Sequence, residues 1–187
     1  MSFLINPFAF AVAGGDFESI ATVTVGSGGA SEIEFTSIPA TYQHLQIRGV
    51  LRGVDNGAGG NERASIVVRL NGDTGSNYTY HALLGNGSSA SAGALSSQTA
   101  TYPGFYATNT AGASEFAAVV GDILDYGVTT KYKTMRAISG HDGNGNGQVG
   151  LFSGLWMDTA AVTSVALTIT GDIAQHSTLA LYGVKAP

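Results

Sequence analysis

The sequence predicts an all-β protein, a two-sheet antiparallel β-sandwich of jelly-roll type that follows an extended N-terminal arm. Three observations predict this fold. Apolar and polar side chains alternate with a period of two through most of the chain, as in half-buried strands. Clusters of Gly, Asn, Asp and Ser separate the alternating segments and supply the backbone angles of turns. No segment of helical length shows a clear 3.6-residue period, and 27 of the 187 residues are glycine, which weakens helices.

The alternation is clear in HLQIRGVLR, where Leu45, Ile47 and Leu51 share one face and Gln46 and Arg48 the other. Turn clusters such as VDNGAGGN and LNGDTGSN follow strands of this kind. Short strands joined by frequent turns favour a sandwich over helical architectures. The expected strands span residues 17–25, 31–36, 44–53, 64–71, 78–84, 115–125, 131–139, 148–157, 162–170 and 175–184.

Two segments are less regular. Residues 85–114, which contain Pro103, are rich in small residues and predict a surface loop with one short strand. The segment ASEFAAVVGDILDYG is the best helix candidate, but its β-branched and aromatic residues suit a strand equally well. We expect residues 17–187 to form a single domain, because a chain of this length can bury its own core.

Residues 1–16 form the predicted arm, which ends in a Gly14-Gly15 hinge. Exposed aromatic side chains are costly in water, so we expect the arm to dock on a partner. One alternative is that the arm folds back onto its own core. Another is a signal peptide ending at Ala13, although such peptides carry a basic n-region and the first basic residue is Arg48. The expected partner-binding residues are Phe3, Leu4, Ile5, Phe8 and Phe10.

Composition excludes several classes of protein. The net charge is −5 with only 8 basic residues, so the chain cannot build the large basic patch that nucleic acid or an anionic membrane surface requires. Charged residues make up 11% of the chain, less than half of the ~25% usual in soluble domains. Without cysteine, neither disulfides nor thiolate chemistry are available. No apolar run reaches the ~18–20 residues of a membrane helix.

The stretch HDGNGNGQVG at 141–150 matches three patterns. Asp142, Asn144 and Asn146 resemble the start of a calcium loop, but position 12 is Ser153 instead of a bidentate Glu, and the flanks predict strands. The glycines fit G-x-G-x-x-G, yet a strand follows them where a dinucleotide site needs a helix. The remaining interpretation is a hairpin loop, and we expect neither a tightly bound metal nor a cofactor.

The sequence offers only weak candidates for a catalytic or metal site. The four histidines, His44, His81, His141 and His176, have no local metal-pair spacing, and no G-x-S-x-G elbow occurs. We expect His44 to be solvated on the polar face of its strand, and His81, amid aromatic residues, could be buried and hydrogen-bonded.

Paired carboxylates occur at Asp122 and Asp125 and at Glu32 and Glu34. The glutamate pair could suit glycosidase chemistry, but a solvated strand face explains it more simply. Trp156 could be a carbohydrate platform, although a tryptophan at a strand end is more often part of the core. We therefore predict a protein that is not an enzyme.

Longer phrases of the sequence resemble a family of bacteriophage virion proteins common in marine and cyanobacterial phages. Together they cover nearly the whole chain after residue 16, although no single phrase carries known chemistry. The resemblance is carried by FESIATVTVGSGGASEIEFTSIPATYQHLQIRG at 17–49, RLNGDTGSNYTYHALLGNGSSASAG at 69–93, DILDYGVTTKYKTMRAISG at 122–140, SGLWMDTAAVTSVALT at 153–168 and LALYGVKA at 179–186.

The resemblance implies a non-enzymatic virion component, assembled in the host cytoplasm and labelled as structural, capsid-decorating or tail-fibre-like. We expect a capsid cement protein that binds the outside of the shell, with the major capsid protein as its partner. We further expect a homo-oligomer, and a trimer suits the local three-fold positions of an icosahedral shell. The alternative is a tail-fibre or receptor-binding domain, in which the arm attaches to a tail protein and loops 54–61, 85–114 and 140–147 contact host surface glycans.

Overall fold

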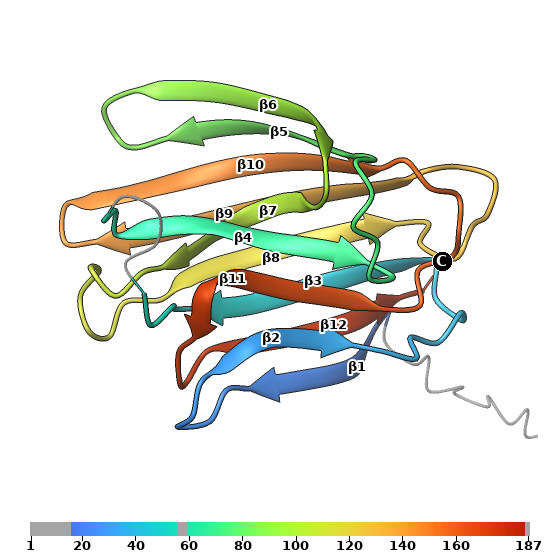
Figure 1. Cartoon of the computed structure of the whole chain (residues 1–187), viewed down its shortest axis with the longest axis horizontal. Helices are drawn as coiled ribbons and strands as arrows, with labels where there is room; N and C mark the ends of the chain where they lie inside the picture. Colours follow the sequence, from blue (N-terminus) through green and yellow to red (C-terminus); the bar gives the residue numbers. More distant parts are fainter. Residues whose placement is uncertain (1–15, 56–59, 186–187) are drawn as a thin grey trace, which may run out of the picture.

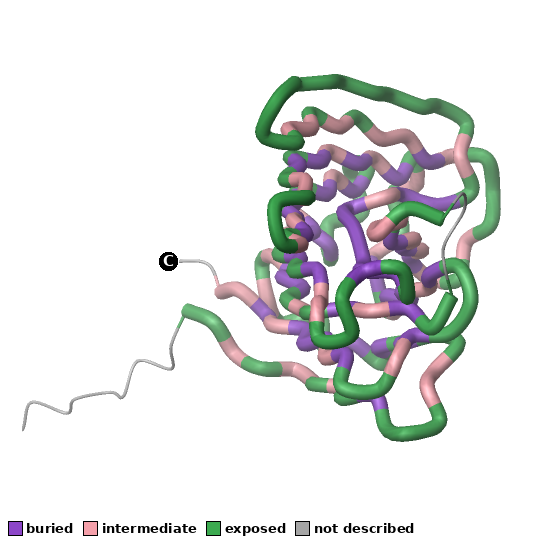
Figure 2. Tube along the Cα trace, turned by 90° about the vertical axis from the view of Figure 1, so that its left-hand side faces the viewer, coloured by how far each residue is buried: buried purple, intermediate pink, exposed green. Residues whose placement is uncertain are grey.

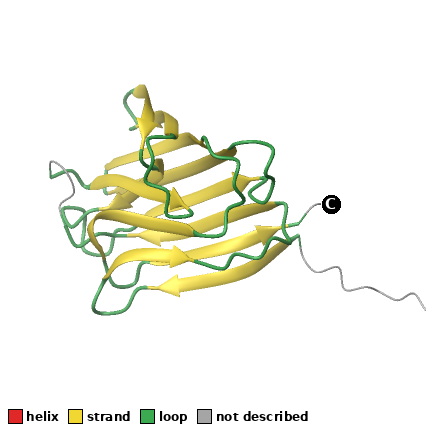
Figure 3. Ribbon diagram, turned by 45° about the vertical axis from the view of Figure 1, so that its right-hand side comes forward, coloured by secondary structure: helices red, strands yellow, loops and turns green. Residues whose placement is uncertain are grey.

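The computed structural model describes residues 16–55 and 60–185, which form strands and loops without any helix (Figures 1 and 3). No helix in this part of the chain is therefore long and apolar enough to span a membrane. The strands are β1 (Phe17–Thr24), β2 (Ala30–Phe35), β3 (His44–Leu51), β4 (Arg63–Leu70), β5 (Tyr78–Gly85), β6 (Ala90–Gln98), β7 (Thr101–Ala107), β8 (Ala117–Leu124), β9 (Lys133–Gly143), β10 (Asn146–Trp156), β11 (Val165–Ile173) and β12 (Thr178–Val184).

The strands form two antiparallel sheets that pack face to face. The larger sheet has eight strands in the order β1-β12-β3-β8-β9-β10-β5-β6, and the smaller has four in the order β2-β11-β4-β7. Every ladder between these strands is antiparallel. Figure 1 shows the small sheet in front of part of the large one, with β5 and β6 extending beyond it. The predicted all-β, two-sheet antiparallel sandwich is confirmed.

The strand pairs are nested along the chain. In the large sheet β1 pairs with β12 and β3 with β8, and in the small sheet β2 pairs with β11 and β4 with β7. Two hairpins, β5–β6 and β9–β10, interrupt this series, and both add to the same edge of the large sheet. Most of the ladders therefore join residues that are far apart in sequence, and the core closes only when the two ends of the chain meet.

The core lies between the two sheets and follows the predicted alternation. Leu45, Ile47 and Ile123 of the large sheet and Ile66 and Val68 of the small sheet are completely buried and belong to one cluster. A smaller cluster under β7 contains an edge-to-face aromatic pair, Phe105 and Phe152, with ring centroids 5.3 Å apart. ASEFAAVVGDILDYG, the best helix candidate, forms strand β8 instead, with its alternate residues in the core.

The prediction of a surface loop over residues 85–114 is wrong. This segment contains β6, which is almost entirely exposed (Figure 2), and β7, which is almost entirely buried. Pro103 is tolerated because β7 is an edge strand and its register with β4 shifts at this point. The small residues and the proline of this segment do not predict a strand. The burial of β7 depends on its packing against β9 and β10, which are distant in sequence.

The stretch HDGNGNGQVG forms a hairpin, as predicted, although its strands continue further than expected. The ladder between β9 and β10 extends to the pair Gly143 and Asn146, which leaves a two-residue turn. Gly145 adopts a φ of 87°, which is strained for residues with a side chain. The turn chemistry of this stretch therefore accounts for its composition.

Candidate interaction surface

The outer face of the large sheet carries a row of apolar side chains that nothing in the described chain covers. The row crosses neighbouring strands in register, from β8 through β9 and β10 to β5. We call it the apolar row. Its members are Val120, Ile138, Leu151 and Leu83, which are 37%, 50%, 55% and 54% exposed, respectively.

Each residue of the apolar row has a chain neighbour that points into the core. Val119 is buried beside the exposed Val120, and Phe152 is buried beside the exposed Leu151. These strands are therefore apolar on both faces, a pattern usual for strands covered on both sides. Soluble monomers rarely leave contiguous apolar patches uncovered, so this face has the character of an interaction surface.

A polar row runs beside the apolar row. On each strand it lies two residues from the apolar row, toward the end of the sheet at which β3 begins. Its side chains hydrogen-bond to one another along the sheet. Gln46 Nε2 donates to Asp122 Oδ1 at 2.6 Å, and an Arg136 guanidinium nitrogen donates to Ser153 Oγ at 2.6 Å. His81 also belongs to this row and is exposed, so the prediction that it could be buried is wrong. The polar row therefore borders the apolar row with side chains that hydrogen-bond to one another.

The outer face is hollowed along the apolar row. The largest hollow, of about 640 Å³, contains all four residues of the row. A second, of about 370 Å³, shares Val120 and continues over β3 to Arg48 and Tyr182. A third, of about 240 Å³, shares Leu83 and Leu151 and continues to Val149. We call these three adjoining shallow hollows the trough.

At one end of the trough, an arginine side chain lies over two aromatic rings. The Arg48 guanidinium lies 5.4 Å from the ring centre of Phe17 and 5.4 Å from that of Tyr182. Arg48 is exposed, and contacts of this kind contribute about 0.5–1 kcal/mol at exposed sites. Phe17 is the first residue of β1, so the start of the folded domain and the end of the trough lie side by side.

The other sequence candidates do not assemble into one site. Glu32 and Glu34 are exposed on β2, as expected for a solvated face. Asp122 accepts from Gln46, whereas Asp125 binds Lys131 at 2.5 Å. The hydrogen bond from Lys131 holds the pKa of Asp125 below its usual range, opposite to what a general acid needs.

Trp156 is buried and cannot be a carbohydrate platform. Its Nε1 donates to Asp73 Oδ2 at 2.7 Å, and its ring stacks with that of Tyr78 at 6.2 Å. His44 is half-buried instead of solvated, and its Nδ1 accepts from the backbone N–H of Asp125 at 2.9 Å. Both side chains are therefore part of the scaffold.

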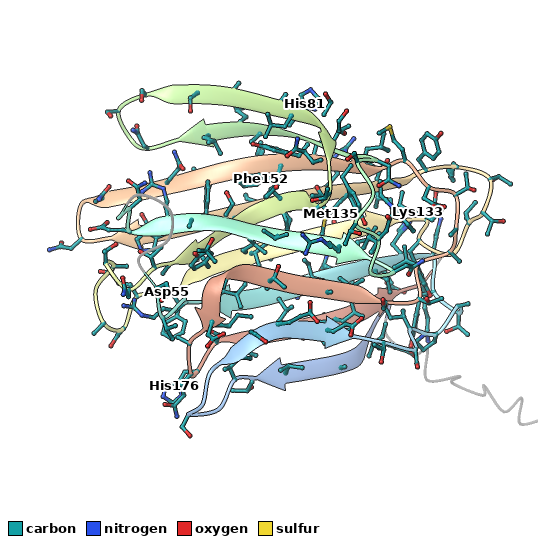
Figure 4. All side chains as sticks on the ribbon, in the orientation of Figure 1. Asp55, His81, Lys133, Met135, Phe152 and His176 are labelled. Carbon is teal, nitrogen blue, oxygen red and sulfur yellow. The ribbon has the colours of Figure 1, made fainter. Side chains whose placement is uncertain are left out.

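His141 is the one histidine that is fully buried, and no pattern in the sequence predicted its burial. Its Nε2 lies 3.4 Å from Glu115 Oε2, and neither ring nitrogen makes a hydrogen bond of good geometry within the described chain. The remaining histidines His81 and His176 are exposed at opposite sides of the molecule (Figure 4). Among the residues described, no three His, Cys, Asp or Glu side chains are grouped to hold a metal ion.

The predicted arm residues, Phe3, Leu4, Ile5, Phe8 and Phe10, lie outside the described residues. Comparison with known proteins gives no further assignment, because no family model, curated protein or solved structure matches this chain. The trough is therefore the feature on which a function must be argued, and its signal in the sequence was the run of adjacent apolar residues in β5, β8, β9 and β10.

Proposed function

We propose that this chain is a non-enzymatic structural protein of a bacteriophage virion, a cement protein that binds the outer capsid shell as an oligomer. The apolar row carries the part of the proposal that concerns association with another chain, whether a shell protein or a second copy. A protein that presents four large, half-exposed apolar side chains in one register functions while bound to another protein, because the free surface is costly in water. The phrase-level resemblance to phage virion proteins supports the same class.

The strand order adds support. Without the hairpins β5–β6 and β9–β10, the sheets have the orders β1-β12-β3-β8 and β2-β11-β4-β7. We infer that this nested frame is a jelly roll, the double-sheet architecture found in viral capsid proteins, lectins and cupins. Because one fold serves many functions, the frame supports the proposal without selecting among these classes.

A tail-fibre or receptor-binding domain is the alternative. It is favoured by a polar hollow of about 430 Å³ between the tips of the two hairpins, lined by Asn86, Asp142, Asn146 and Gln148 among others. Amide and carboxylate groups of this kind can hydrogen-bond sugar hydroxyls. The hollow contains no aromatic side chain, whereas carbohydrate sites commonly stack sugars on aromatic rings.

Copy number separates the two functions. Cement proteins accompany the shell in hundreds of copies, whereas fibres are present in a few to a few tens. We expect quantitative mass spectrometry of purified virions to give a ratio to the major capsid protein within a few-fold of one. A ratio typical of minor tail proteins would overturn the cement function and favour the fibre, and absence of the chain from virions would overturn both.

A second measurement tests whether the chain is a hydrolase that acts on host glycans. Purified protein is incubated with host surface polysaccharide, and newly formed reducing ends are counted. We expect none above the buffer control, because Glu32 and Glu34 are exposed on β2 and Asp122 and Asp125 are engaged by Gln46 and Lys131, so neither carboxylate pair forms a catalytic site. Release of oligosaccharide would contradict a purely structural function.

A further inference from the structure

We propose that the trough is the binding site for the N-terminal arm of a second copy of this chain, with residues 3–10 lying across β3, β8, β9, β10 and β5. This inference rests on the proposed function in one respect, the oligomer. It assigns both sides of the contact: a described surface on one protomer and a sequence segment of its neighbour.

Shape favours an inserted segment over a second sheet. The outer face is hollowed at three adjoining places along the apolar row. Two such faces placed opposite each other leave voids wherever hollow meets hollow, and voids forfeit the dispersion contacts that stabilise an interface. A single extended segment fills a trough of this kind.

Length agrees with this occupant. Crossing from β3 to β5 takes four interstrand steps, or about 19 Å at ~4.8 Å for each step. Residues 3–10, if extended, span about 26 Å at ~3.3 Å for each residue. The arm segment therefore covers the apolar row completely and extends slightly beyond it.

The chemistry of the two sides is complementary. The arm segment FLINPFAF contains no charged side chain and five large apolar ones. In the trough, the apolar row lies at the centre, and the charged groups Asp122 and Arg136 lie on the rim beside it. Such an arrangement, with an apolar centre and a polar rim, is typical of protein interfaces. Pro7 lacks an N–H, which suits a segment lying on a sheet face without a ladder to extend.

The direction of β1 favours a neighbour over the same chain. The backbone N–H of Lys185 donates to the carbonyl of Asp16, so the antiparallel pairing continues one residue beyond β1, to the last residue of the predicted arm. A chain that extends straight on from Asp16 moves away from its own sheet. Reaching its own trough would require the chain to reverse at Gly14-Gly15, whereas reaching a neighbour requires no reversal. Head-to-tail contacts form a ring when the rotation between copies closes, and a trimer is one such ring.

The first experiment compares two apolar side chains of equal exposure on opposite faces of the large sheet. Ile138 is 50% exposed in the trough, and Leu95 is 49% exposed on β6, where it is paired with the inward-facing Tyr80. We expect wild-type protein to sediment as an oligomer and Ile138→Glu to raise the dissociation constant at least tenfold. Leu95→Glu should leave it within about twofold, and deletion of residues 2–13 should reproduce Ile138→Glu.

The second experiment asks which copy supplies the arm. The chain has no cysteine, so Phe8→Cys in one preparation and Ile138→Cys in another can be mixed and treated with a short bismaleimide. Because each chain then carries one thiol, a mixed cross-link proves contact between copies. We expect this product in high yield, and little when Leu95→Cys replaces Ile138→Cys.

Clear outcomes would overturn the inference. A monomeric wild type, an oligomer that survives the deletion, or equal cross-linking to Leu95→Cys would each refute the trough as the arm site. Cross-linking confined to one chain in the double variant Phe8→Cys and Ile138→Cys would refute the second copy. A monomer that is nonetheless abundant in virions refutes only this inference, whereas an arm-linked oligomer absent from virions refutes only the proposed function.

Discussion

The two faces of the large sheet are built from the same strands and similar side chains, yet they meet different surroundings. On the inner face of β8, Val119 and Ile123 are buried against the small sheet. On the outer face, Val120 and its neighbour Ile138 are as apolar and remain partly in water. Apolar composition therefore does not separate a core from an interface. The difference lies in which face the chain itself covers.

At one end of the inner face, polar side chains cover the core and form hydrogen bonds with neighbouring loops. At the end where β9 begins, the buried Lys133 Nζ donates to the carbonyls of Val128, Lys131 and Thr159 at 2.7, 3.0 and 3.0 Å. Burial lowers the pKa of Lys133, but its donors are used in holding two loops together. Among the described residues, no loop covers the apolar row of the outer face, which leaves that row available for a partner.

The largest expected effect comes from removing equal volumes on the two faces. Ile123→Ala should lower the free energy of unfolding by about 3–4 kcal/mol, because it leaves a cavity in the core. Ile138→Ala should cost less than about 1 kcal/mol, since its side chain already contacts water. Urea unfolding at submicromolar protein, where association contributes least, measures both. Equal losses would show that the outer face is structurally closed in the free chain.

Lys133→Met tests the closure at the end of the inner face. The methionine keeps most of the volume and removes all three donors, so three partly buried carbonyls lose this partner. We expect a loss of about 2 kcal/mol in unfolding free energy. Lys131→Met, which removes only an exposed ion pair with Asp125, is the control and should cost at most about 1 kcal/mol. Hydrogen exchange should rise selectively in residues 127–132 and 158–161. An unchanged stability would assign the buried lysine no structural role.

Asp73 closes the same end by accepting hydrogen bonds, and its contribution depends on pH. Its carboxylate accepts from Trp156 Nε1, Asn77 Nδ2 and Gly75 N, and these bonds, that from Trp156 foremost, lower its pKa below the usual 3.8. A carboxyl with a depressed folded-state pKa stabilises the protein above its unfolded pKa and loses that effect as the pH falls through the folded value.

The test is the melting temperature of Asp73→Asn and wild type between pH 7 and pH 2. At pH 7 the variant should be less stable by on the order of 1 kcal/mol, and the difference should shrink below about pH 4. A difference that stays constant across this range would show that the charge of the carboxylate is not what the indole N–H recognises.

The smallest effect is expected for Leu151→Ser on the outer face. At low protein concentration the change should lie within about 0.5 kcal/mol. The melting temperature of wild type should rise with protein concentration, as mass action predicts for an oligomer, and that rise should be weaker in the variant. If the two proteins show the same concentration dependence, Leu151 does not contribute to the contact between copies.

Much of the fold could be predicted from local pattern because strands record their environment in alternate residues. Leu45, Ile47 and Leu51 were assigned to one face and are buried together. Strand β7 could not be predicted, since TYPGFYA has no alternation and is buried on both sides by segments distant in sequence. His81 and His141 show the same limit, because whether a histidine is covered depends on strands that its neighbours in sequence do not reveal.

The sequence by itself determined the strand class, the hairpin at 141–150 and the exclusion of a large basic surface. These properties follow from the period of side chains along a strand, from turn chemistry and from charge, all of which are local or additive. Only the tertiary structure decided that Val120, Ile138, Leu151 and Leu83 share one register row on an uncovered face. That alignment depends on the order and register of strands separated by up to 68 positions, from Leu83 to Leu151, and no local pattern encodes it.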